Sequence, residues 1–400
     1  MSRTAVVGAG FAGLAAADAL AAAGHDVVVL EARDRVGGRV HSVPFAGGLV
    51  ERGAEFVFDG HEQVQAHGAR FGLTLADKGF PYGDREPRGG LPTTRAAVVA
   101  AAAGLGAAAA AGGSVADAVE RLDADPAARA AVRARLEMTH ATPADQLSAS
   151  VLEGDEGSSF GDYTSTTVVE GNQAIAAGLA RGLADVRLGA PVRAIAWEPE
   201  GDARLTVEGG EDIQAERVVV AVPLAVLDQV AFTPALPGAL RGALARAGIG
   251  HAAKLFLALA GPAAPASVMA PAERYWTFTS LGAGGAAPRV CGAFAGTLEA
   301  VERLVPGGDP SPWVASVTAL RPDLQVDPAS ALAATWHDDP WARGAYSAGV
   351  LGTLPGDEEL LAAPIGPLHW AGEHLAGAYA GYMEGALRSG QRAARAILVG

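Results

Sequence analysis

Residues 4–31 read TAVVGAGFAGLAAADALAAAGHDVVVLE, and this stretch decides the fold. Its first four residues are an apolar run typical of a buried strand, and they lead directly into the pattern GxGxxG at residues 8–13. Residues 14–23 have a helical composition and end at a glycine. Residues 26–30 predict a second strand, which ends in Glu31. The order strand, glycine turn, helix, strand and acid predicts a dinucleotide-binding unit.

Each residue of the turn has a physical task in such a unit. Gly8 permits the tight turn, Gly10 lets the backbone approach a pyrophosphate, and Gly13 allows the helix to pack closely on the strand. The N-terminus of the helix offers free N–H groups and a partial positive charge to the phosphates. Glu31 can accept hydrogen bonds from the ribose hydroxyls, and an acid there disfavours the 2′-phosphate of NADP. The alternative is a glycine turn that binds no ligand. In that case the turn, the helix and the acid at the end of the second strand would occur together only by chance.

A basic, glycine-hinged loop follows the second strand. Residues 31–39 read EARDRVGGR, and the glycine pair lets this loop come close to a ligand. Arg39 can neutralise a pyrophosphate with two parallel hydrogen bonds. The alternative is a solvated charged turn made by Arg33, Arg35 and Arg39. Here the chain resembles the flavin-containing amine oxidase family, which includes monoamine and polyamine oxidases and in which an acid followed by a Gly-Gly-Arg loop binds FAD.

The C-terminus carries a second match to this family. Residues 371–374 read AGEH, and residues 381–386 read GYMEGA and are followed by a helical pattern. Gly381 and Gly385 let the start of this helix approach a flat ring, and the helix dipole can stabilise negative charge on the N1–C2=O edge of a reduced flavin. Glu373 can bond ribityl or phosphate-proximal groups if it is protonated or water-bridged. The alternative is an ordinary glycine-capped helix at the C-terminus. This segment and the N-terminal glycine pattern would then occur in one chain by coincidence.

Between the two ends the resemblance is weaker but keeps its order. Residues 51–56, ERGAEF, resemble the segment that runs under the flavin, and Val192 lies where the family contacts the adenine half of FAD. Trp336 matches a tryptophan that packs on the flavin ring. The match is thinnest in residues 80–165, where the family builds its helical substrate lid. The cofactor site that the resemblance implies consists of Gly8, Gly10, Gly13, Glu31, Arg33, Gly38, Arg39, Gly53, Ala54, Glu55, Phe56, Val192, Trp336, Gly372, Glu373, Tyr382 and Met383.

Two tyrosines and one lysine are candidates for the chemistry. Oxidation of an amine by flavin needs a neutral amine, its α C–H close to flavin N5 and a dry site, and aromatic walls help to exclude water. The resemblance places Tyr346 and Tyr382 at the positions of the paired cage tyrosines of monoamine oxidases, with simple packing as the alternative for each. Lys254 lies in the apolar run HAAKLFL, where an unpaired ammonium would be costly. The family places a lysine here, water-bridged to flavin N5, where it assists reoxidation by oxygen; the alternative is an edge-strand lysine that reaches solvent.

Other positions bear on the substrate and on how FAD is held. Phe56 and Trp341 are candidate walls of the substrate cavity beside the two tyrosines, although core packing would explain either one. Monoamine oxidases that tether flavin covalently carry cysteine just before the cage tyrosine, whereas this chain has Ala345. We therefore expect FAD to be bound non-covalently.

Comparison with related oxidases limits the substrate further. L-Amino acid oxidases place an arginine where this chain has Phe56, which argues against a free amino acid. Arg70, Arg85 or Arg88 could substitute for that arginine. Polyamine oxidases often line their tunnel with acids, for which the candidates here are Glu55, Asp59 and Glu62. The alternative for these three acids is a set of solvated loop charges.

The composition limits the partners and the location. The 400 residues carry a formal net charge of −14, which repels phosphate backbones, so we expect no nucleic-acid partner. The single cysteine, Cys291, permits no intrachain disulfide, and the nine histidines show no metal-ligand spacing. Residues 96–111 are rich in alanine and contain two glycines, which predicts a packed helix and not a membrane span. No secretory signal precedes the first strand, so we expect a cytoplasmic protein without membrane contact, and a homodimer stays open.

We therefore expect an α/β (α+β) protein with a Rossmann-like FAD-binding domain and an interleaved substrate domain of mixed sheet plus helices. Residues 1–75, 166–240 and 340–400 are expected to form the FAD-binding domain, and residues 76–165 and 241–339 the substrate-binding domain. The expected function is oxidation of a small amine to the imine or aldehyde, with hydride transfer to flavin N5 and reoxidation by O₂ to give H₂O₂. The alternatives are an FAD-dependent desaturase or dehydrogenase acting on C–C bonds, an amine-oxidising tailoring enzyme, and a non-catalytic FAD-binding protein.

Overall fold

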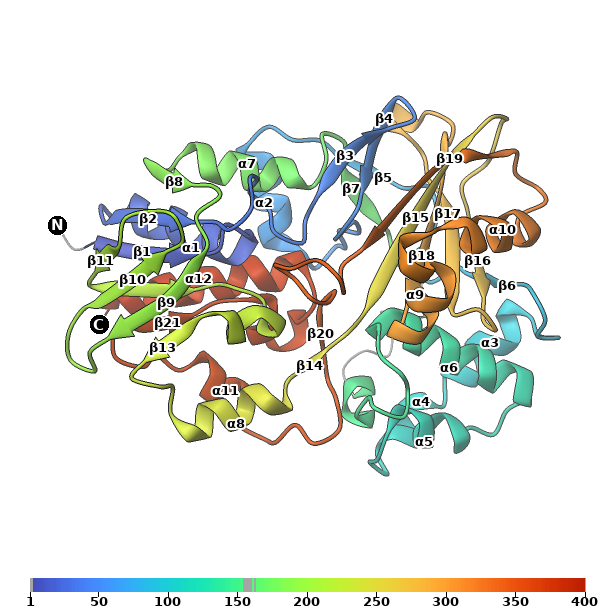
Figure 1. Cartoon of the computed structure of the whole chain (residues 1–400). Helices are drawn as coiled ribbons and strands as arrows, with labels where there is room; N and C mark the ends of the chain where they lie inside the picture. Colours follow the sequence, from blue (N-terminus) through green and yellow to red (C-terminus); the bar gives the residue numbers. More distant parts are fainter. Residues whose placement is uncertain (1–2, 154–159, 162, 400) are drawn as a thin grey trace.

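The computed structural model describes residues 3–153, 160–161 and 163–399, and it shows two parts side by side (Figure 1). One part is built on a five-stranded sheet and contains both chain termini; the other is built on a six-stranded sheet. The chain crosses between the two parts several times, as the interleaved arrangement predicted. This mixture of helices and sheets confirms the expected fold class, whereas the exact domain boundaries stay a prediction.

The first part is organised around a parallel sheet that contains the glycine turn. Its strands pair in the order β21, β12, β1, β2, β8. Side chains alternate between its faces, so Ala5 and Val7 pack in one core cluster and Val6 in the other. The five strands of this sheet are β1 Arg3–Val7, β2 Asp26–Leu30, β8 Asp185–Arg187, β12 Arg217–Val220 and β21 Leu368–Trp370.

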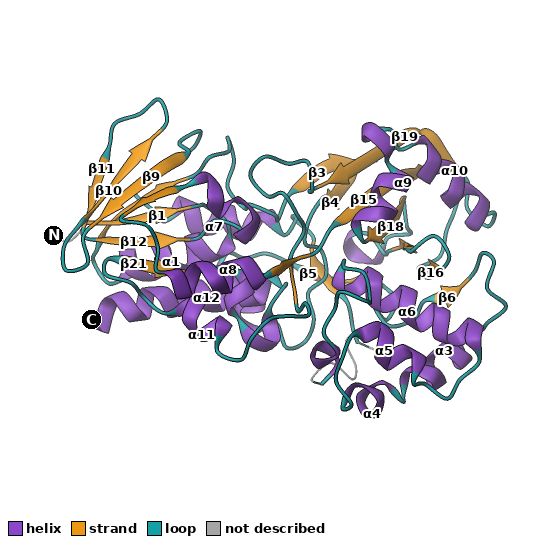
Figure 2. Ribbon diagram, turned by 60° about the horizontal axis from the view of Figure 1, so that its bottom comes forward, coloured by secondary structure: helices purple, strands orange, loops and turns teal. Residues whose placement is uncertain are grey.

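Helices cover one face of this sheet and a second sheet covers the other (Figure 2). The helical face holds α1 (Phe11–Ala22), α2 (Glu62–Arg70), α7 (Gln173–Arg181) and α12 (Met383–Val399). The opposite layer consists of β9 (Val192–Trp197), β10 (Ala203–Val207), β11 (Ile213–Ala215) and β13 (Ala231–Thr233), with α8 (Gly238–Arg246) and α11 (Asp357–Ala362) beside it. Both faces of the parallel sheet are therefore buried, which explains why its strands read as continuous apolar runs.

The second part is a six-stranded sheet with the order β19, β15, β18, β17, β16, β6. One face is covered by α9 (Leu298–Leu304) and α10 (Ser311–Leu320), and the other by α3 to α6, at the lower right of Figure 1. The strand bounds are β6 Glu86–Pro87, β15 Ala252–Leu259, β16 Ala266–Ala270, β17 Tyr275–Thr279, β18 Val290–Gly296 and β19 Val326–Thr335, and the helix bounds are α3 Arg95–Ala102, α4 Leu105–Ala109, α5 Val115–Glu120 and α6 Pro126–His140.

Short elements connect the two parts. They are the pairs β3 (Ser42–Phe45) with β4 (Gly48–Glu51), β5 (Leu75–Asp77) with β7 (Thr166–Val168), and β14 (Gly248–Ile249) with β20 (Ser347–Ala348). The single helix expected at residues 96–111 is corrected to two, α3 and α4, because the chain turns at Gly104. No helix among the described residues is long and apolar enough to cross a membrane.

The contact between α1 and α12 depends on a glycine. A Cβ added at Gly390 in α12 would lie 2.1 Å from the Ala12 carbonyl oxygen, so an alanine there must push the two helices apart. We expect Gly390→Ala to lower the free energy of unfolding by about 1–3 kcal/mol, measured by urea denaturation. The control is Gly68→Ala in α2, where nothing lies within 4 Å of the added Cβ. That variant should be neutral or slightly stabilising, and an equal loss in both would contradict the packing argument.

Candidate functional site

One continuous cavity of about 670 Å³ runs from the glycine turn of the first part to the sheet of the second part. Its size lies in the range typical of sites for cofactors and small ligands. Every site residue predicted from the sequence lines this cavity except Gly13. Those that line it are Gly8, Gly10, Glu31, Arg33, Gly38, Arg39, Gly53, Ala54, Glu55, Phe56, Val192, Lys254, Trp336, Trp341, Tyr346, Gly372, Glu373, Tyr382 and Met383.

The glycine turn leaves open space at the start of α1. Gly8 has a φ of +106°, which disfavours any side chain, and a Cβ there would lie 2.9 Å from the Ala221 carbonyl oxygen. A Cβ at Gly13 would lie 1.9 Å from the Gly8 carbonyl oxygen, so this residue serves close packing and not ligand contact. Nothing lies within 4 Å of a Cβ added at Gly10, which faces the cavity and caps α1. The free N–H groups of α1 therefore open onto the cavity, where a pyrophosphate would be stabilised.

The acid and the arginines after β2 are held in place by the protein. Glu31 accepts hydrogen bonds from the Ala9 N–H (2.7 Å) and the Arg33 N–H (2.9 Å), and burial raises its pKa above the ordinary value. Arg33 makes two hydrogen bonds of 2.8 Å to Asp339 and lies over the Trp336 ring. Arg35 donates to the Gly38 carbonyl oxygen at 2.9 Å. A solvated charged turn is therefore the wrong interpretation of this loop.

Arg39 and Glu373 form an ion pair at the middle of the cavity. Arg39 Nη1 lies 3.1 Å from Glu373 Oε1 and donates to the Ala345 carbonyl oxygen at 2.6 Å. Glu373 also accepts from the Ser347 hydroxyl (2.6 Å) and the Gly381 N–H (2.7 Å). Burial alone would raise the pKa of Glu373, but Arg39 and these donors lower it. The carboxyl is therefore ionised, which rules out the protonated alternative for Glu373 and leaves the water-bridged one.

These residues fit a dinucleotide with a flat ring. Arg52 lines the cavity, and among the described residues its buried Nε has no hydrogen-bond partner, so a polar group of a bound cofactor would satisfy it. Helix α12 begins at Met383, and both Tyr382 and Met383 line the cavity. The partial positive charge at the N-terminus of this helix therefore lies at the cavity wall. Glu31 and Val192 both line the end of the cavity near the glycine turn, so this end suits the adenosine half of a dinucleotide.

Aromatic side chains line the other end of the cavity. Phe56 lies 5.7 Å from Trp276 and 5.1 Å from Tyr82, measured between ring centroids, and all three line the cavity. Tyr346 donates its hydroxyl to the Thr139 carbonyl oxygen at 2.7 Å, and burial raises its pKa well above the ordinary value, so the phenol stays neutral. Tyr382 lies 6.3 Å from Phe58 in an edge-on contact. The structure thus brings both predicted cage tyrosines to one aromatic cavity.

Lys254 belongs to a buried network of charges. Its strand β15 lies between β18 and β19, so the alternative of an edge-strand lysine that reaches solvent is wrong. Its ammonium donates to Glu55 Oε2 at 2.6 Å and to the Glu51 carbonyl oxygen at 2.9 Å. Lys78 donates to the other oxygen of Glu55, also at 2.6 Å. Burial would raise the pKa of Glu55, but the two lysines lower it, whereas burial lowers the pKa of Lys254.

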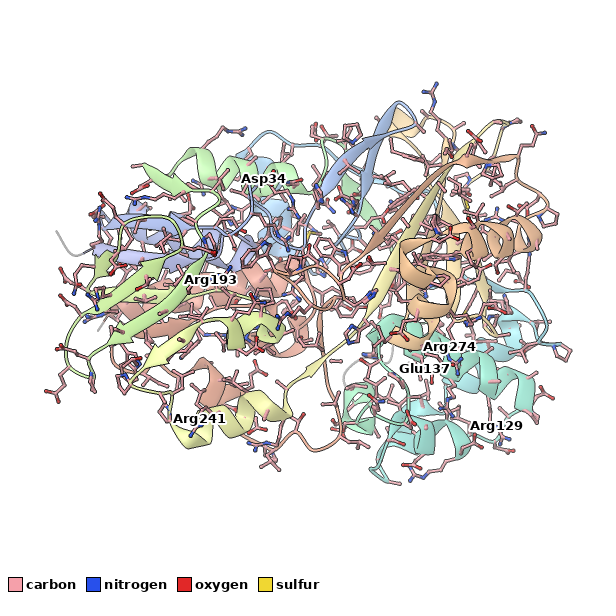
Figure 3. The ribbon with its side chains drawn as sticks, viewed as in Figure 1. Asp34, Arg129, Glu137, Arg193, Arg241 and Arg274 are labelled. Atoms are coloured by element: carbon pink, nitrogen blue, oxygen red, sulfur yellow. The ribbon has the colours of Figure 1, made fainter. Side chains whose placement is uncertain are left out.

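Several predicted residues take other positions than expected. Trp341 lies under the Arg193 guanidinium, 5.0 Å from it, next to Val192 at the adenosine end. Figure 3 shows Arg193 in the first part of the molecule. The role of Trp341 as a wall of the substrate cavity therefore stays a prediction, with its ring packed against Arg193. Asp59 and Glu62 are exposed and do not line the cavity.

Sequence reasoning missed Lys78, Tyr82, Thr139 and Trp276. Lys78 and Tyr82 lie in a segment without a recognisable motif, and Thr139 lies at the end of a helix that no pattern places near the cavity. Trp276 carried a usable indication, because the run Tyr275–Thr279 alternates and sets Trp276 and Phe278 on one face of a strand.

A parallel βαβ unit with an acid at the second strand, joined to an aromatic cavity with a buried lysine, defines an oxidoreductase that binds a dinucleotide cofactor. The model of the family described as flavin containing amine oxidoreductase matches residues 11–104 and 109–398. The chain belongs to this family, and FAD is its cofactor.

Individual relatives agree with the family. The chain is 27% identical to polyamine oxidase 4 of Oryza sativa subsp. japonica, over 97% of the chain and 87% of that protein. It is 26% identical to (S)-6-hydroxynicotine oxidase of Paenarthrobacter nicotinovorans, over 98% of each. It is 30% identical to histone demethylase-like protein A of Aspergillus fumigatus over 66% of the chain, which spans only 27% of the length of that protein.

Two solved structures show the same fold. Putrescine oxidase bound to putrescine has a TM-score of 0.83 at 24% identity and covers 100% of this chain and 99% of its own. Cyclohexylamine oxidase from Brevibacterium oxydans has a TM-score of 0.80 at 22% identity and covers 99% of this chain and 98% of its own.

Removing Lys78 tests the charge network. Lys78→Met leaves the buried Glu55 with one cation, so we expect a loss of about 3–5 kcal/mol in the free energy of unfolding, measured by urea denaturation. The control is Arg3→Met, which breaks the exposed pair of Arg3 with Asp26 and should cost at most about 1 kcal/mol. A loss in Lys78→Met no larger than in the control would show that Lys254 alone holds Glu55.

The raised pKa of the buried Glu51 should make the stability of the folded protein depend on pH. Its carboxyl accepts from the Asn172 N–H and the Ser42 hydroxyl, and burial raises its pKa from 4.5 to about 7. The folded state therefore holds a proton that the unfolded chain releases, and this stabilisation is lost as the pH rises from about 4.5 to about 7. Over this range the unfolding free energy of the wild type should fall relative to that of Glu51→Gln by up to about 3 kcal/mol. Parallel stability curves in urea titrations would contradict the assignment.

Proposed function

We propose that the protein oxidises a small amine with O₂ and water to an aldehyde, ammonia and hydrogen peroxide. The observation that carries this proposal is the aromatic cavity in which Tyr346 and Tyr382 stand with a buried Lys254. Bound FAD would supply the oxidant, since it accepts a hydride at N5 and is reoxidised by O₂. Residues 1–75, 166–240 and 340–400 would hold the cofactor, and residues 76–165 and 241–339 the substrate.

The side chains at the aromatic end would bind and orient the amine. Tyr346 is fixed by its hydrogen bond to Thr139, so its ring is a rigid wall. Phe56 and Trp276 exclude water, which keeps the amine neutral and its lone pair available. No side-chain base is needed when hydrogen leaves as hydride. Lys254, held by Glu55, would serve the reaction with oxygen, as the resemblance to the family implied.

The alternatives receive less support. A desaturase or dehydrogenase acting on C–C bonds would not require the tyrosine pair or the buried lysine. A tailoring enzyme that captures the imine shares the same chemistry up to product release. A non-catalytic FAD-binding protein would have a plugged cavity, but here the cavity extends past the tyrosines to Phe56 and Trp276. The polyamine, putrescine, cyclohexylamine and hydroxynicotine oxidases that the chain resembles all act on amines by name, which supports an amine substrate.

Anaerobic mixing with a panel of primary, secondary and polyamines tests the function. We expect one class of amine to bleach the FAD absorbance near roughly 450 nm, and air to restore it with release of peroxide. Tyr382→Leu should keep FAD and lower kcat/KM by about 10- to 100-fold, because one wall of the amine site is lost. The control is Tyr379→Leu, whose tyrosine does not line the cavity and which should retain activity.

The same preparation tests the mode of FAD binding. Because Ala345 stands where a tethering cysteine would be, acid precipitation should leave FAD in the supernatant. Full-length protein that holds no FAD and takes up none, or flavin that no amine bleaches, would overturn the proposed function.

A further inference from the structure

Two arginines are buried beside the aromatic end of the cavity. Arg85, just before β6, and Arg135, on α6, are each 2% exposed. The Arg85 guanidinium lies 3.9 Å from the centroid of the Trp276 ring and 4.5 Å from that of Tyr82. Both of these rings line the cavity, so Arg85 lies directly against its wall.

Arg135 approaches the same wall from the helix. It lies one turn before Thr139 on α6, so the two side chains share a face of that helix. Thr139 lines the cavity, and its carbonyl oxygen accepts the Tyr346 hydroxyl. The guanidinium of Arg135 lies over the Phe160 ring at 4.7 Å. Neither arginine lines the cavity itself, but Arg85 packs on two rings that do and Arg135 shares a helix face with Thr139, which also does.

Polar atoms in this group lack partners. Within the part of the chain that the structure describes, Nε, Nη1 and Nη2 of Arg85, Nε and Nη2 of Arg135 and the Thr139 hydroxyl are buried without a hydrogen bond. Burial lowers the pKa of both arginines, but a guanidinium starts so far above neutrality that it keeps its charge. A buried charge without a partner is strongly destabilising. Among the described residues these atoms therefore have no anionic partner, and the anionic group of a ligand would supply one.

The nearby acids already have other partners. Glu137 on α6 pairs with Arg274, and Figure 3 shows these two side chains together beside that helix. Asp84 pairs with Arg95. Of the acids that line the cavity, Glu55 is shared by two lysines and Glu373 is bound by Arg39. Among the described residues, no free acid at the aromatic end could receive the second ammonium of a diamine.

We propose that Arg85 and Arg135 form a carboxylate-binding subsite, and that the substrate is an amine that also carries a carboxylate. The amine would lie between Tyr346 and Tyr382, and the carboxylate would point toward the two arginines. Because the Tyr82 and Trp276 rings stand between Arg85 and the cavity, binding requires the Tyr82 side chain to turn aside. This inference rests on the proposed amine oxidation and names the class of amine.

A chain-length series tests the proposal with the wild-type holoenzyme. Peroxide release is measured for linear amino acids from glycine to 6-aminohexanoate, for alkylamines and for diamines of matched length. We expect the best amino acid to exceed its matched alkylamine and diamine at least tenfold in kcat/KM. A diamine or alkylamine as the best substrate would overturn the carboxylate subsite and leave amine oxidation standing. If no amine in any series reduces the flavin, the proposed function fails instead.

Variants identify the residues. Arg85→Gln and Arg135→Gln should each lower kcat/KM for the amino acid by roughly 10- to 100-fold, mainly through KM, and change the alkylamine less than about threefold. The control is Arg88→Gln, three residues from Arg85, which is exposed and pairs with Asp323. Equal losses for both substrates in Arg85→Gln and Arg135→Gln would indicate a purely structural role.

Two measurements do not depend on turnover. Pentanoate should perturb the FAD absorbance of the wild type on static titration, and this response should be lost in Arg85→Gln; no response in the wild type would overturn the subsite. Arg85→Met removes a buried charge that has no anionic partner among the described residues, so its melting temperature should equal or exceed that of the wild type. A lower melting temperature would show that Arg85 stabilises the fold and is not held for a ligand.

Discussion

The buried carboxylate of Glu55 holds together three segments that are far apart in the sequence. Glu55 lies in the loop after β4, Lys254 comes from the middle of β15, and Lys78 follows β5. None of these charges could be buried alone, because desolvation would cost several kcal/mol for each. Their mutual contacts therefore fix where the six-stranded sheet meets the first part of the molecule. The cavity exists at this junction, so its shape depends on this ion pair network.

The same junction gives the cavity two electrostatically different ends. Away from the aromatic end the charges are paired and fixed: Asp339 binds Arg33 at the adenosine end, and Glu373 binds Arg39 at the middle of the cavity. Together with the N-termini of α1 and α12 they offer positive potential to a pyrophosphate and a flavin edge. At the aromatic end the lining rings carry no charge. Arg85 packs on the Tyr82 and Trp276 rings, and among the described residues neither Arg85 nor Arg135 has an anionic partner. The first end suits a permanent cofactor, whereas the second suits a ligand that brings its own charge.

How far the sequence predicted this arrangement depends on how local each feature is. The glycine turn, the acid at Glu31 and the start of α12 are encoded in short continuous stretches, so their patterns were readable without a structure. The break at Gly104 was missed because a glycine in an alanine-rich run can be tolerated or can end a helix. The ionisation of Glu373 depends on Arg39, more than three hundred residues away in the chain. Lys78 and Arg135 belong to no motif and do not line the cavity, and only tertiary packing brings Lys78 to Glu55, which does.

The negative charge on the surface of the protein and the positive charge of the buried arginines act at different stages of substrate recognition. A net charge of −14 attracts cationic amines over distances of about the Debye length, roughly 8–10 Å at physiological ionic strength, and it does so without regard to their structure. Inside, where the dielectric is low and water is excluded, two guanidinium groups act far more strongly on whatever reaches the tyrosines. A diamine would be attracted by the surface and repelled by this interior, whereas a zwitterion is favoured inside at its anionic end. The acidic surface therefore says little about the substrate, and the buried arginines behind Tyr82 and Trp276 are the residues that would discriminate.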